Sequence, residues 1–326
     1  MGPIEVVVIR HHTIEAVHKV FAVALEKNKE VAVFGDGDWM TYWRSTAKPF
    51  QAIAVVASGA ADEFGLSDEE LAIACGSHSG SAYHIGVVKT LLDKSGLTVE
   101  HLKCTPHEPF DRHEAIRLCR EGKDPSPLHS NCSGKHSAML AAAKKMGCNL
   151  EDYTSPSHPV QLLILQALTE ATGDQKVKET VVSDGCGAPI WANRLKDIAK
   201  AFQRFAMGDF SFGAASQRLF LAMVAHPEMV AAKGHWNTRI IEALRGRFAG
   251  KGGAEGLFAG GFSDGRAFAV KVLDGQHRAT PIATIALLKW LGWFSKEEEE
   301  ALEDLAQPPV KTLAGVTVGT MRAVFP

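Results

Sequence analysis

The sequence predicts a mixed α/β protein in which strands from both ends of the chain form one central, mainly antiparallel sheet. Two observations favour this class. β-Branched and alternating segments lie near the two ends, whereas capped, apolar helical segments fill the middle. No repeat or low-complexity linker divides the 326 residues. We therefore expect a single domain over 1–326, with a sheet region at about 1–44 and 248–326 and a large helical lobe at about 45–247.

The N-terminal part of the chain has the pattern of strands joined by polar turns. Residues 4–10 form a β-branched run, and segments 14–25 and 31–35 alternate loosely on either side of a polar turn at 26–30. This pattern indicates a hairpin. A helix across 14–27 is the competing interpretation, because Ala, Val and Leu suit either state.

The middle of the chain carries the helical signals. A mostly apolar run over 51–59 predicts a buried helix, and Ser67-Asp68-Glu69-Glu70 is a capping box that starts the next one. A short strand at 180–183 interrupts the series. Further helices are expected at 82–95, 111–121, 137–147, 158–172, 191–207, 212–225 and 236–247.

The C-terminal part returns to strands. A glycine-rich loop at 250–256 leads into a strand, a tight turn at 263–265 and a returning strand. The run Glu297–Glu300 fits the solvated face of a terminal helix. The remaining elements are strands at 257–262, 266–273 and 310–318 and a helix at 279–293. We expect the first and last strands to meet in the sheet.

Composition excludes several classes of function. The chain is 46% hydrophobic and 22% charged with a net charge of −2, so neither nucleic acid nor a membrane surface is an expected partner. No apolar run reaches the length of a membrane span, and the first residues lack the pattern of a signal peptide. We expect a cytoplasmic protein whose six cysteines are reduced thiols, some of them candidate metal ligands.

The pair Ser45 and Lys48 is the first chemical signal. The two residues lie three apart at the start of the predicted helix, so a lysine amine can reach the serine hydroxyl one turn back. An apolar pocket would keep the amine neutral and able to accept the serine proton. A helix-start serine beside a solvated lysine is the alternative, and the pair alone favours that alternative.

Two later stretches change this balance. Ser77-His78-Ser79 follows the capped helix, and Lys251-Gly252-Gly253 precedes a late strand. With Ser45 and Lys48, this order is similar to the motifs of serine β-lactamases and penicillin-binding proteins. Ser79 departs from the usual Asn, and Gly252 departs from the usual Thr. The departures weaken a β-lactam interpretation but leave two serines and two lysines.

A narrower family matches more of the chain. Five motifs carry this match: Arg44-Ser45-Thr46-Ala47-Lys48-Pro49-Phe50-Gln51, Cys75-Gly76-Ser77-His78-Ser79-Gly80, Asn131-Cys132-Ser133-Gly134-Lys135-His136, Asp184-Gly185-Cys186-Gly187 and Lys251-Gly252-Gly253-Ala254-Glu255-Gly256. Through them the sequence resembles the Rhizobium-type (class 3) L-asparaginases from Arg10 to the last strand.

The resemblance implies a β-lactamase-like fold, a homodimer, and hydrolysis of L-asparagine to L-aspartate and ammonia. It also implies two serine–lysine pairs, of which Ser45 with Lys48 is the first. Ser77 matches the second serine, with Lys251 as its lysine and Lys271 as the fallback. Ser45 is our first choice for the nucleophile and Lys48 for its base. Ser77 and the second lysine would then move the proton, although these roles can be exchanged.

The resemblance further places a zinc ion on Cys132, Lys135 and Cys186, with Asp184 close by. Two thiolates favour zinc over magnesium or calcium. From the residues alone, Lys135 suggests instead an anion-binding lysine at a helix N-terminus. With three protein ligands one position stays open, and we expect the metal to orient the substrate.

Four residues are candidates for substrate binding: Arg44, His136, Asp184 and Gly252. Arg44 would hold a substrate carboxylate or form a surface salt bridge, two interpretations of equal weight. His136 would contact the substrate or support the metal site. Gly252 would let the backbone approach the substrate closely.

Two rival functions remain open. The first is another serine–lysine hydrolase of the same fold, such as a glutaminase or a β-lactamase-like enzyme. The second is a binding protein that is held together by zinc and has no catalytic activity.

Overall fold

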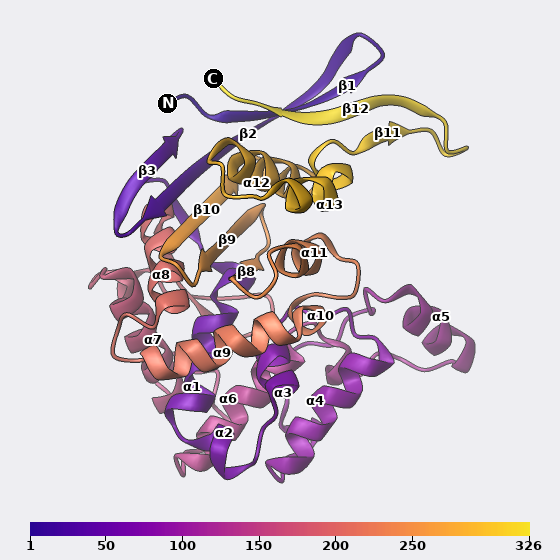
Figure 1. Cartoon of the computed structure of the whole chain (residues 1–326). Helices are drawn as coiled ribbons and strands as arrows, with labels where there is room; N and C mark the ends of the chain where they lie inside the picture. The colour runs from indigo at the N-terminus through magenta and orange to yellow at the C-terminus, as the bar shows by residue number, and fades with distance from the viewer.

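The computed structural model describes residues 1–326, and its central feature is one antiparallel sheet of eight strands (Figure 1). The strand order is β11-β12-β1-β2-β10-β9-β8. Strand β3 pairs with β2 on the same side of β2 as β1. The strands are β1 (Ile4–Arg10), β2 (Thr13–Glu26), β3 (Lys29–Phe34), β8 (Phe248–Gly252), β9 (Leu257–Phe262), β10 (Arg266–Val272), β11 (Pro309–Lys311) and β12 (Thr317–Val324).

The two ends of the chain meet in this sheet, as the sequence predicts. Strand β1 pairs with β12 through Val6 and Ala323, and β2 pairs with β10 through Val23 and Ala269. Strands β2 and β3 form the expected hairpin, with Val23 opposite Val33. The helical alternative for 14–27 is therefore wrong, and the predicted mixed α/β class is confirmed.

Helices cover the sheet and form a lobe below it (Figure 1). Helix α8 packs on β2, β9 and β10, and α12 packs on β1, β10 and β12, so β10 lies buried between helices. The helices are α1 (Lys48–Ala57), α2 (Ala60–Glu63), α3 (Asp68–Ala74), α4 (Ala82–Lys94), α5 (Arg112–Glu121), α6 (Ser133–Lys145), α7 (Pro159–Thr172), α8 (Leu195–Met207), α9 (Gly213–Ala225), α10 (Pro227–Val230), α11 (Trp236–Ala243), α12 (Ala279–Trp290) and α13 (Lys296–Ala306). None of these helices combines the length and apolar character that crossing a bilayer requires.

Several helix ends follow the local signals in the sequence. The Ser67 side chain accepts from the N–H of Glu70, and the Glu70 carboxylate accepts from the N–H of Ser67, so the capping box is confirmed. Asp111 caps α5, and Gly122 ends it in a left-handed conformation. These local motifs satisfy helix-end N–H groups and end the last turn, whatever the tertiary context.

Other boundaries differ from the predictions. Helix α8 begins at Leu195 and not at 191, because β6 (Pro189–Ile190) pairs with β5 (Val182–Ser183) and β7 (Ala192–Arg194) pairs with β4 (Met40–Tyr42). The last strand lies at 317–324, after the short β11, and not at 310–318. Helix α6 begins at Ser133, four residues earlier than expected. Tertiary pairing and packing decide these positions, and no local signal marks them.

Strand β8 differs most from the sequence prediction, which places a loop there. Its sequence, Phe248-Ala249-Gly250-Lys251-Gly252, suggests a glycine-rich loop because glycine has low β-propensity. Packing around the strand requires these glycines: a Cβ on Gly250 would lie 2.6 Å from the Phe248 ring. The strand forms the edge of the sheet that faces the helical lobe.

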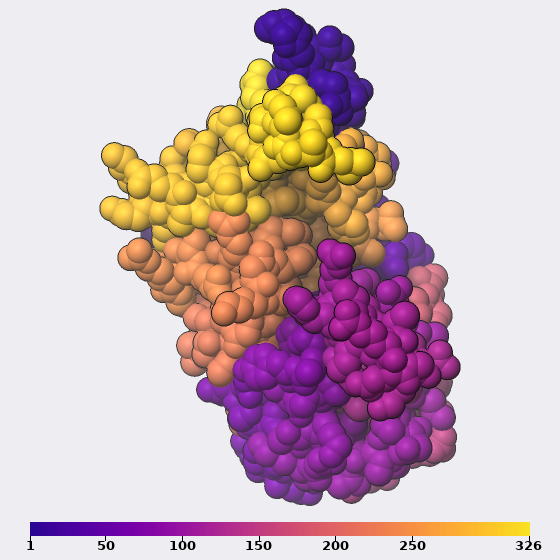
Figure 2. Space-filling view, turned by 90° about the vertical axis from the view of Figure 1, so that its right-hand side faces the viewer, coloured from indigo at the N-terminus to yellow at the C-terminus, as the bar shows by residue number.

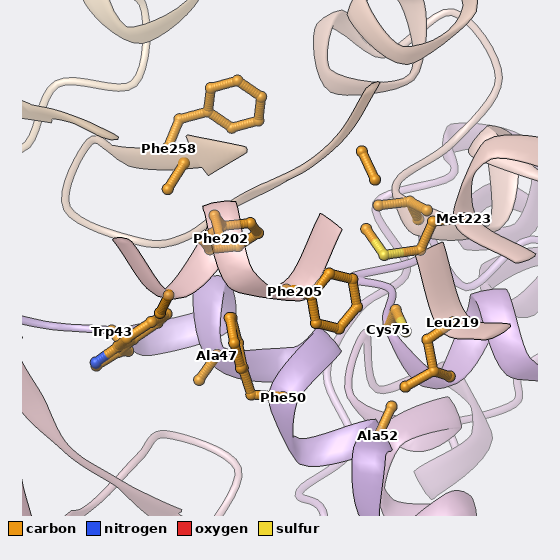
Figure 3. Close-up of a cluster of buried hydrophobic side chains, with 14 of the residues drawn as sticks. Trp43, Ala47, Phe50, Ala52, Cys75, Phe202, Phe205, Leu219, Met223 and Phe258 are labelled. Atoms are coloured by element: carbon orange, nitrogen blue, oxygen red, sulfur yellow. The ribbon is translucent and has the colours of Figure 1, made fainter. Parts of the chain in front are cut away.

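One continuous hydrophobic core joins the sheet to the lobe. In its centre an aromatic group holds α1 against α8 (Figure 3). The Phe50 ring lies 5.1 Å from Trp43, 5.2 Å from Phe202 and 5.2 Å from Phe205, measured between ring centroids. Because Phe50 follows Lys48 by two residues, this packing fixes where α1 starts.

The Phe50→Ala substitution is expected to destabilise the protein by about 3–5 kcal/mol, because it removes a fully buried ring and leaves a cavity. Urea unfolding followed by circular dichroism measures the change. Phe110→Ala, at an exposed phenylalanine, is the control and should change the free energy of unfolding by less than about 0.5 kcal/mol. Equal losses in the two variants would contradict the packing.

Candidate active site

A cavity of about 510 Å³ lies where the edge of the sheet meets the helical lobe. Figure 2 looks onto this side, where a hollow separates the magenta segment that includes α5 from the orange segment around α11. Ser45, Ser77 and Lys251 all line the cavity, together with Gly252. Three segments that are far apart in the sequence therefore converge on one space.

Ser45 lies in a short 3-10 helix, η1 (Arg44–Ala47), directly before α1. The preceding residue, Arg44, has a φ angle of 48°, an uncommon conformation for a residue with a side chain. Trp43 anchors the turn through a 2.8 Å hydrogen bond from its indole N–H to Asn193. The Ser45 hydroxyl has no hydrogen-bond partner within the protein, whereas Lys48 bonds to Ser77. Ser45 is thus free to contact a ligand in the cavity.

The Lys48 side chain is fully buried. Its Nζ donates to Ser77 Oγ at 2.9 Å and to the carbonyl oxygen of Asn131 at 2.9 Å. Burial lowers the pKa of Lys48 from its ordinary value, since the charged amine is poorly solvated there. The structure therefore joins Lys48 directly to Ser77, although the sequence motif pairs it with Ser45.

Ser77 is held by the loop between α3 and α4. Its N–H donates to the carbonyl oxygen of Val230 at 2.9 Å. Gly76 lets this contact form, because a Cβ there would lie 2.1 Å from the carbonyl oxygen of Met229. His78 is buried next to Ser77; its Nδ1 accepts from the Gly80 N–H, so its Nε2 donates to Ser133 Oγ at 2.8 Å. These contacts hold the loop in place, and the Ser77 hydroxyl accepts a hydrogen bond from Lys48.

Lys251 approaches from β8 on the opposite wall of the cavity. Its side chain is almost fully buried, and Nζ donates to the carbonyl oxygen of Gly252 at 2.6 Å. Burial lowers the pKa of Lys251 well below its ordinary value, and the nearby Lys48 lowers it further. Lys271, the fallback, lies on β10, donates to the carbonyl oxygens of Glu255 and Val272, and does not line the cavity. The structure thus places Lys251 with the two serines.

The two predicted thiol ligands converge near Lys48. Cys132 precedes α6, and Lys135 Nζ lies 3.0 Å from Cys186 Sγ. A hydrogen bond from the Cys132 thiol and the charge of Lys135 hold the pKa of Cys186 far below its ordinary value. Burial opposes a charge on Lys135, but Cys186 and Cys132 raise its pKa above the ordinary value. These shifts favour a negative charge on Cys186 beside a positive charge on Lys135.

His136 lies beside these thiols. Its Nδ1 is 2.7 Å from the hydroxyl of Tyr153, whereas its buried Nε2 has no hydrogen-bond partner. Burial lowers the pKa of His136 to about 4, so the ring is neutral at neutral pH. A buried nitrogen lone pair or N–H without a partner is costly, and a bound ion or ligand would relieve it.

Arg44 forms a salt bridge. Its Nε donates to Asp184 Oδ1 at 2.7 Å, and its Nη1 lies 3.8 Å from Glu255. Asp184 is largely buried, and its charge also acts on Lys135. Of the four candidates for substrate binding, Gly252 lines the cavity, while Arg44, Asp184 and His136 do not.

Part of the cavity has no signal in the sequence. His235, Trp236 and Asn237 line it from the start of α11, and Phe110 lines it from the loop before α5. These residues carry no catalytic spacing, and only the position of α11 against β8 brings them to the site. The Asn131 carbonyl, which accepts from Lys48, is a backbone group that no sequence motif marks.

Two hydroxyls and two buried amines around one cavity form a set that can transfer acyl groups by nucleophilic catalysis. Comparison with known proteins gives the same class. The model of the L-asparaginase II family matches residues 6–323. The chain belongs to the L-asparaginase II family, whose name describes an amidohydrolase of the asparaginase type.

Several solved structures are similar to this chain at low identity. They include a candidate β-lactamase from Bacteroides dorei (14% identity, 84% of this chain and 93% of that one, TM-score 0.45). A simvastatin synthase from Aspergillus terreus has 10% identity over 78% of this chain and 86% of that one, with a TM-score of 0.40. A β-lactamase from Mycobacterium bovis has 14% identity over 88% and 95%, with a TM-score of 0.31. No match was found among the curated proteins that were compared.

Proposed function

We propose that the protein hydrolyses L-asparagine to L-aspartate and ammonia with Ser45 as the nucleophile. One observation carries the proposal: Lys48, buried and poorly solvated, bonds to Ser77 at 2.9 Å beneath a cavity that Ser45 also lines. Membership of the L-asparaginase II family supports asparagine as the substrate.

The first half of the reaction forms an ester on Ser45. Its Oγ attacks the side-chain amide carbon of asparagine, and its proton passes to the neutral Nζ of Lys48. The C–N bond then breaks, and the departing nitrogen takes a proton from Ser77, which Lys48 replenishes through their hydrogen bond. Ammonia leaves, and the aspartyl group stays on Ser45.

The second half repeats these transfers with water. A water molecule attacks the ester carbon and gives one proton to Lys48 through Ser77. The ester bond to Ser45 then breaks, and Lys48 returns this proton to the Ser45 Oγ. Aspartate leaves and the starting state is restored. Lys251 assists from the other wall: because it lies near Lys48, the two amines disfavour each other's charge, which favours the neutral form of one of them.

The buried thiol set fits a zinc ion. Cys132, Cys186 and Lys135 supply two sulfurs and a nitrogen, and the unpartnered His136 Nε2 lies beside them. Two thiolates and nitrogen are donors that zinc prefers. We propose that Cys132, Lys135 and Cys186 hold the ion. When bound, it would supply a positive charge that orients the polar groups of the substrate.

Zinc content tests this assignment. The purified protein is expected to hold about one zinc ion per chain. Cys132→Ser and Cys186→Ser should each reduce this content to near zero, whereas Cys119→Ser, at an exposed cysteine, should leave it unchanged. Mass spectrometry of metals gives the readout. Full zinc content in the Cys132 and Cys186 variants would contradict the site.

We propose that Gly252 approaches the substrate through its backbone, because it lines the cavity. Arg44, Asp184 and His136 would act one step further away. Arg44 and Asp184 hold each other, and Asp184 acts electrostatically on Lys135. In this arrangement the Arg44–Asp184 pair and His136 position the metal set, and through it the substrate.

Ammonia release from asparagine, glutamine and a chromogenic β-lactam tests the proposed function. We expect release from asparagine and at most slow turnover of the other two. Turnover of glutamine or the β-lactam without asparagine would favour a different hydrolase of the same class. Binding of asparagine without any turnover would favour a zinc-containing binding protein.

The family resemblance also leads us to propose a homodimer. The β1–β2 hairpin projects from the body of the molecule (Figure 2), and Ile14 and Val17 on it are exposed. Exposed apolar residues on a projecting hairpin suit contact with a second copy. Light scattering after size-exclusion chromatography is expected to give twice the chain mass of 35.1 kDa.

A further inference from the structure

Lys251 lies on an edge strand, where half of the backbone groups have no neighbouring strand. Strand β9 pairs with one side of β8, with Lys251 opposite Ala259. Because backbone groups alternate along an antiparallel strand, the neighbours of Lys251 direct their outer groups away from β9. The position of the Lys251 side chain therefore depends on the groups that bind the side of β8 facing away from β9.

The side chain of Asn237, on α11, occupies that edge. Its Nδ2 donates to the carbonyl oxygen of Gly250 at 3.0 Å, and its Oδ1 accepts from the N–H of Gly252 at 3.0 Å. One carboxamide thus binds the two residues on either side of Lys251, as a peptide group of a further strand would. The pattern also fixes the orientation of the amide, because each atom has one matching partner.

The surroundings show that this contact is built into the fold. Asn237 is almost fully buried, and its N–H donates to His235 Nδ1 at 3.2 Å. Gly252 allows the close approach of α11: a Cβ there would lie 3.3 Å from the Trp236 ring and 3.7 Å from Asn237 Oδ1.

We propose that Asn237 is a positioning residue of the reaction, which holds β8 so that Lys251 faces the two serines. This inference rests on the proposed function, since Asn237 positions Lys251 and Lys251 takes part in the reaction only under that proposal. We assign Asn237 a role through Lys251, because its Oδ1 and one N–H of its Nδ2 are bonded to Gly252 and Gly250, the two neighbours of Lys251.

Two effects follow for Asn237→Ala. Both edge hydrogen bonds are lost, and β8 can shift by a fraction of an ångström while α11 stays in place. Small displacements of a catalytic group reduce rates strongly, so kcat for asparagine is expected to fall about tenfold to a hundredfold. KM should change by less than about threefold, because substrate binding by the rest of the cavity remains.

The matched control is Thr238→Val on the same helix. Thr238 is also buried and donates one hydrogen bond, to the carbonyl oxygen of Pro227 at 3.1 Å, but it makes no hydrogen bond to β8. Thr238→Val should lower the melting temperature about as much as Asn237→Ala does, while its kcat stays within about twofold of the parent value. An equal loss of kcat in Thr238→Val would overturn the proposal, because the effect would then be one of stability.

A double-mutant cycle decides whether Asn237 acts through Lys251. In a Lys251→Met background, Asn237→Ala is expected to lower the residual kcat by less than about twofold, because the group that it positions is gone. If Asn237→Ala lowered kcat by the same factor in the parent and in the Lys251→Met background, the proposal would be overturned. An unchanged kcat in the single variant Asn237→Ala would overturn it as well. If Lys251→Met itself keeps full activity, the role of Lys251 in the proposed function fails, and this outcome is distinct from the others.

Discussion

Ser45→Ala is expected to lower kcat for asparagine by about a thousandfold or more, because it removes the only cavity hydroxyl that is free of protein partners. The loss should appear in kcat and kcat/KM alike, since the ester forms only after binding. Ammonia release gives the readout, and the zinc content of the variant serves as the check that the site is intact. Activity above about a tenth of the parent value would contradict the assignment.

The comparison with Ser77→Ala separates the two serines. In the proposed mechanism Ser77 relays a proton, and such transfers contribute about a hundredfold to ten-thousandfold. Its loss removes the 2.9 Å partner of Lys48 but leaves the nucleophile. We therefore expect Ser77→Ala to retain the ability to form an ester on Ser45, slowly, and Ser45→Ala to lose it.

Lys48→Met has the second large expected effect, a fall in kcat of about a thousandfold or more. The substitution keeps the length of the buried side chain but removes the amine that accepts the serine proton. The melting temperature shows whether the variant is folded, because the substitution also removes the hydrogen bonds from Lys48 to Ser77 and to the Asn131 carbonyl. Measured kcat and thermal unfolding together test this result; a variant that is folded and still active would contradict the role of Lys48.

The same group predicts the pH dependence of the parent enzyme. Burial lowers the pKa of Lys48, so the amine becomes neutral below the ordinary lysine value of 10.5. Below its own pKa the amine binds a proton and cannot accept another, so kcat should fall as the pH is lowered and level off above it. A rate that rises on acidification would have the wrong sign.

Lys271→Met is the matched control for both results. Lys271 is buried as well, but it donates to the carbonyl oxygens of Glu255 and Val272 outside the cavity. Its loss can affect stability, yet kcat and the pH profile should stay close to those of the parent. A thousandfold loss in this variant would point to the fallback lysine.

Local signals account for what the sequence predicts well. The Ser67 capping box, the Asp111 cap and the β2–β3 hairpin depend on residues that lie next to one another in the chain. The candidate site is recognisable because its residues occur in motifs, and the structure brings Ser45, Ser77 and Lys251 to one cavity. The motifs name these groups without giving their hydrogen-bond partners.

The remaining features depend on contacts between distant segments. Strand β8 looks like a loop in the sequence, because its glycines serve the packing of Phe248 and the approach of α11. Lys48 reaches Ser77, in a different loop, and this contact follows from how α1 and α3 pack in the lobe. Asn237 has no motif, and its role depends on the edge position of β8.

The location of the covalent intermediate is the sharpest test of Ser45 as the nucleophile. Asparagine is mixed with the protein, the reaction is stopped with acid within milliseconds, and the digested peptides are weighed by mass spectrometry. We predict an aspartyl ester on the peptide that contains Ser45, absent in Ser45→Ala and enriched in Ser77→Ala. An ester on the Ser77 peptide in place of the Ser45 peptide would contradict the proposed mechanism.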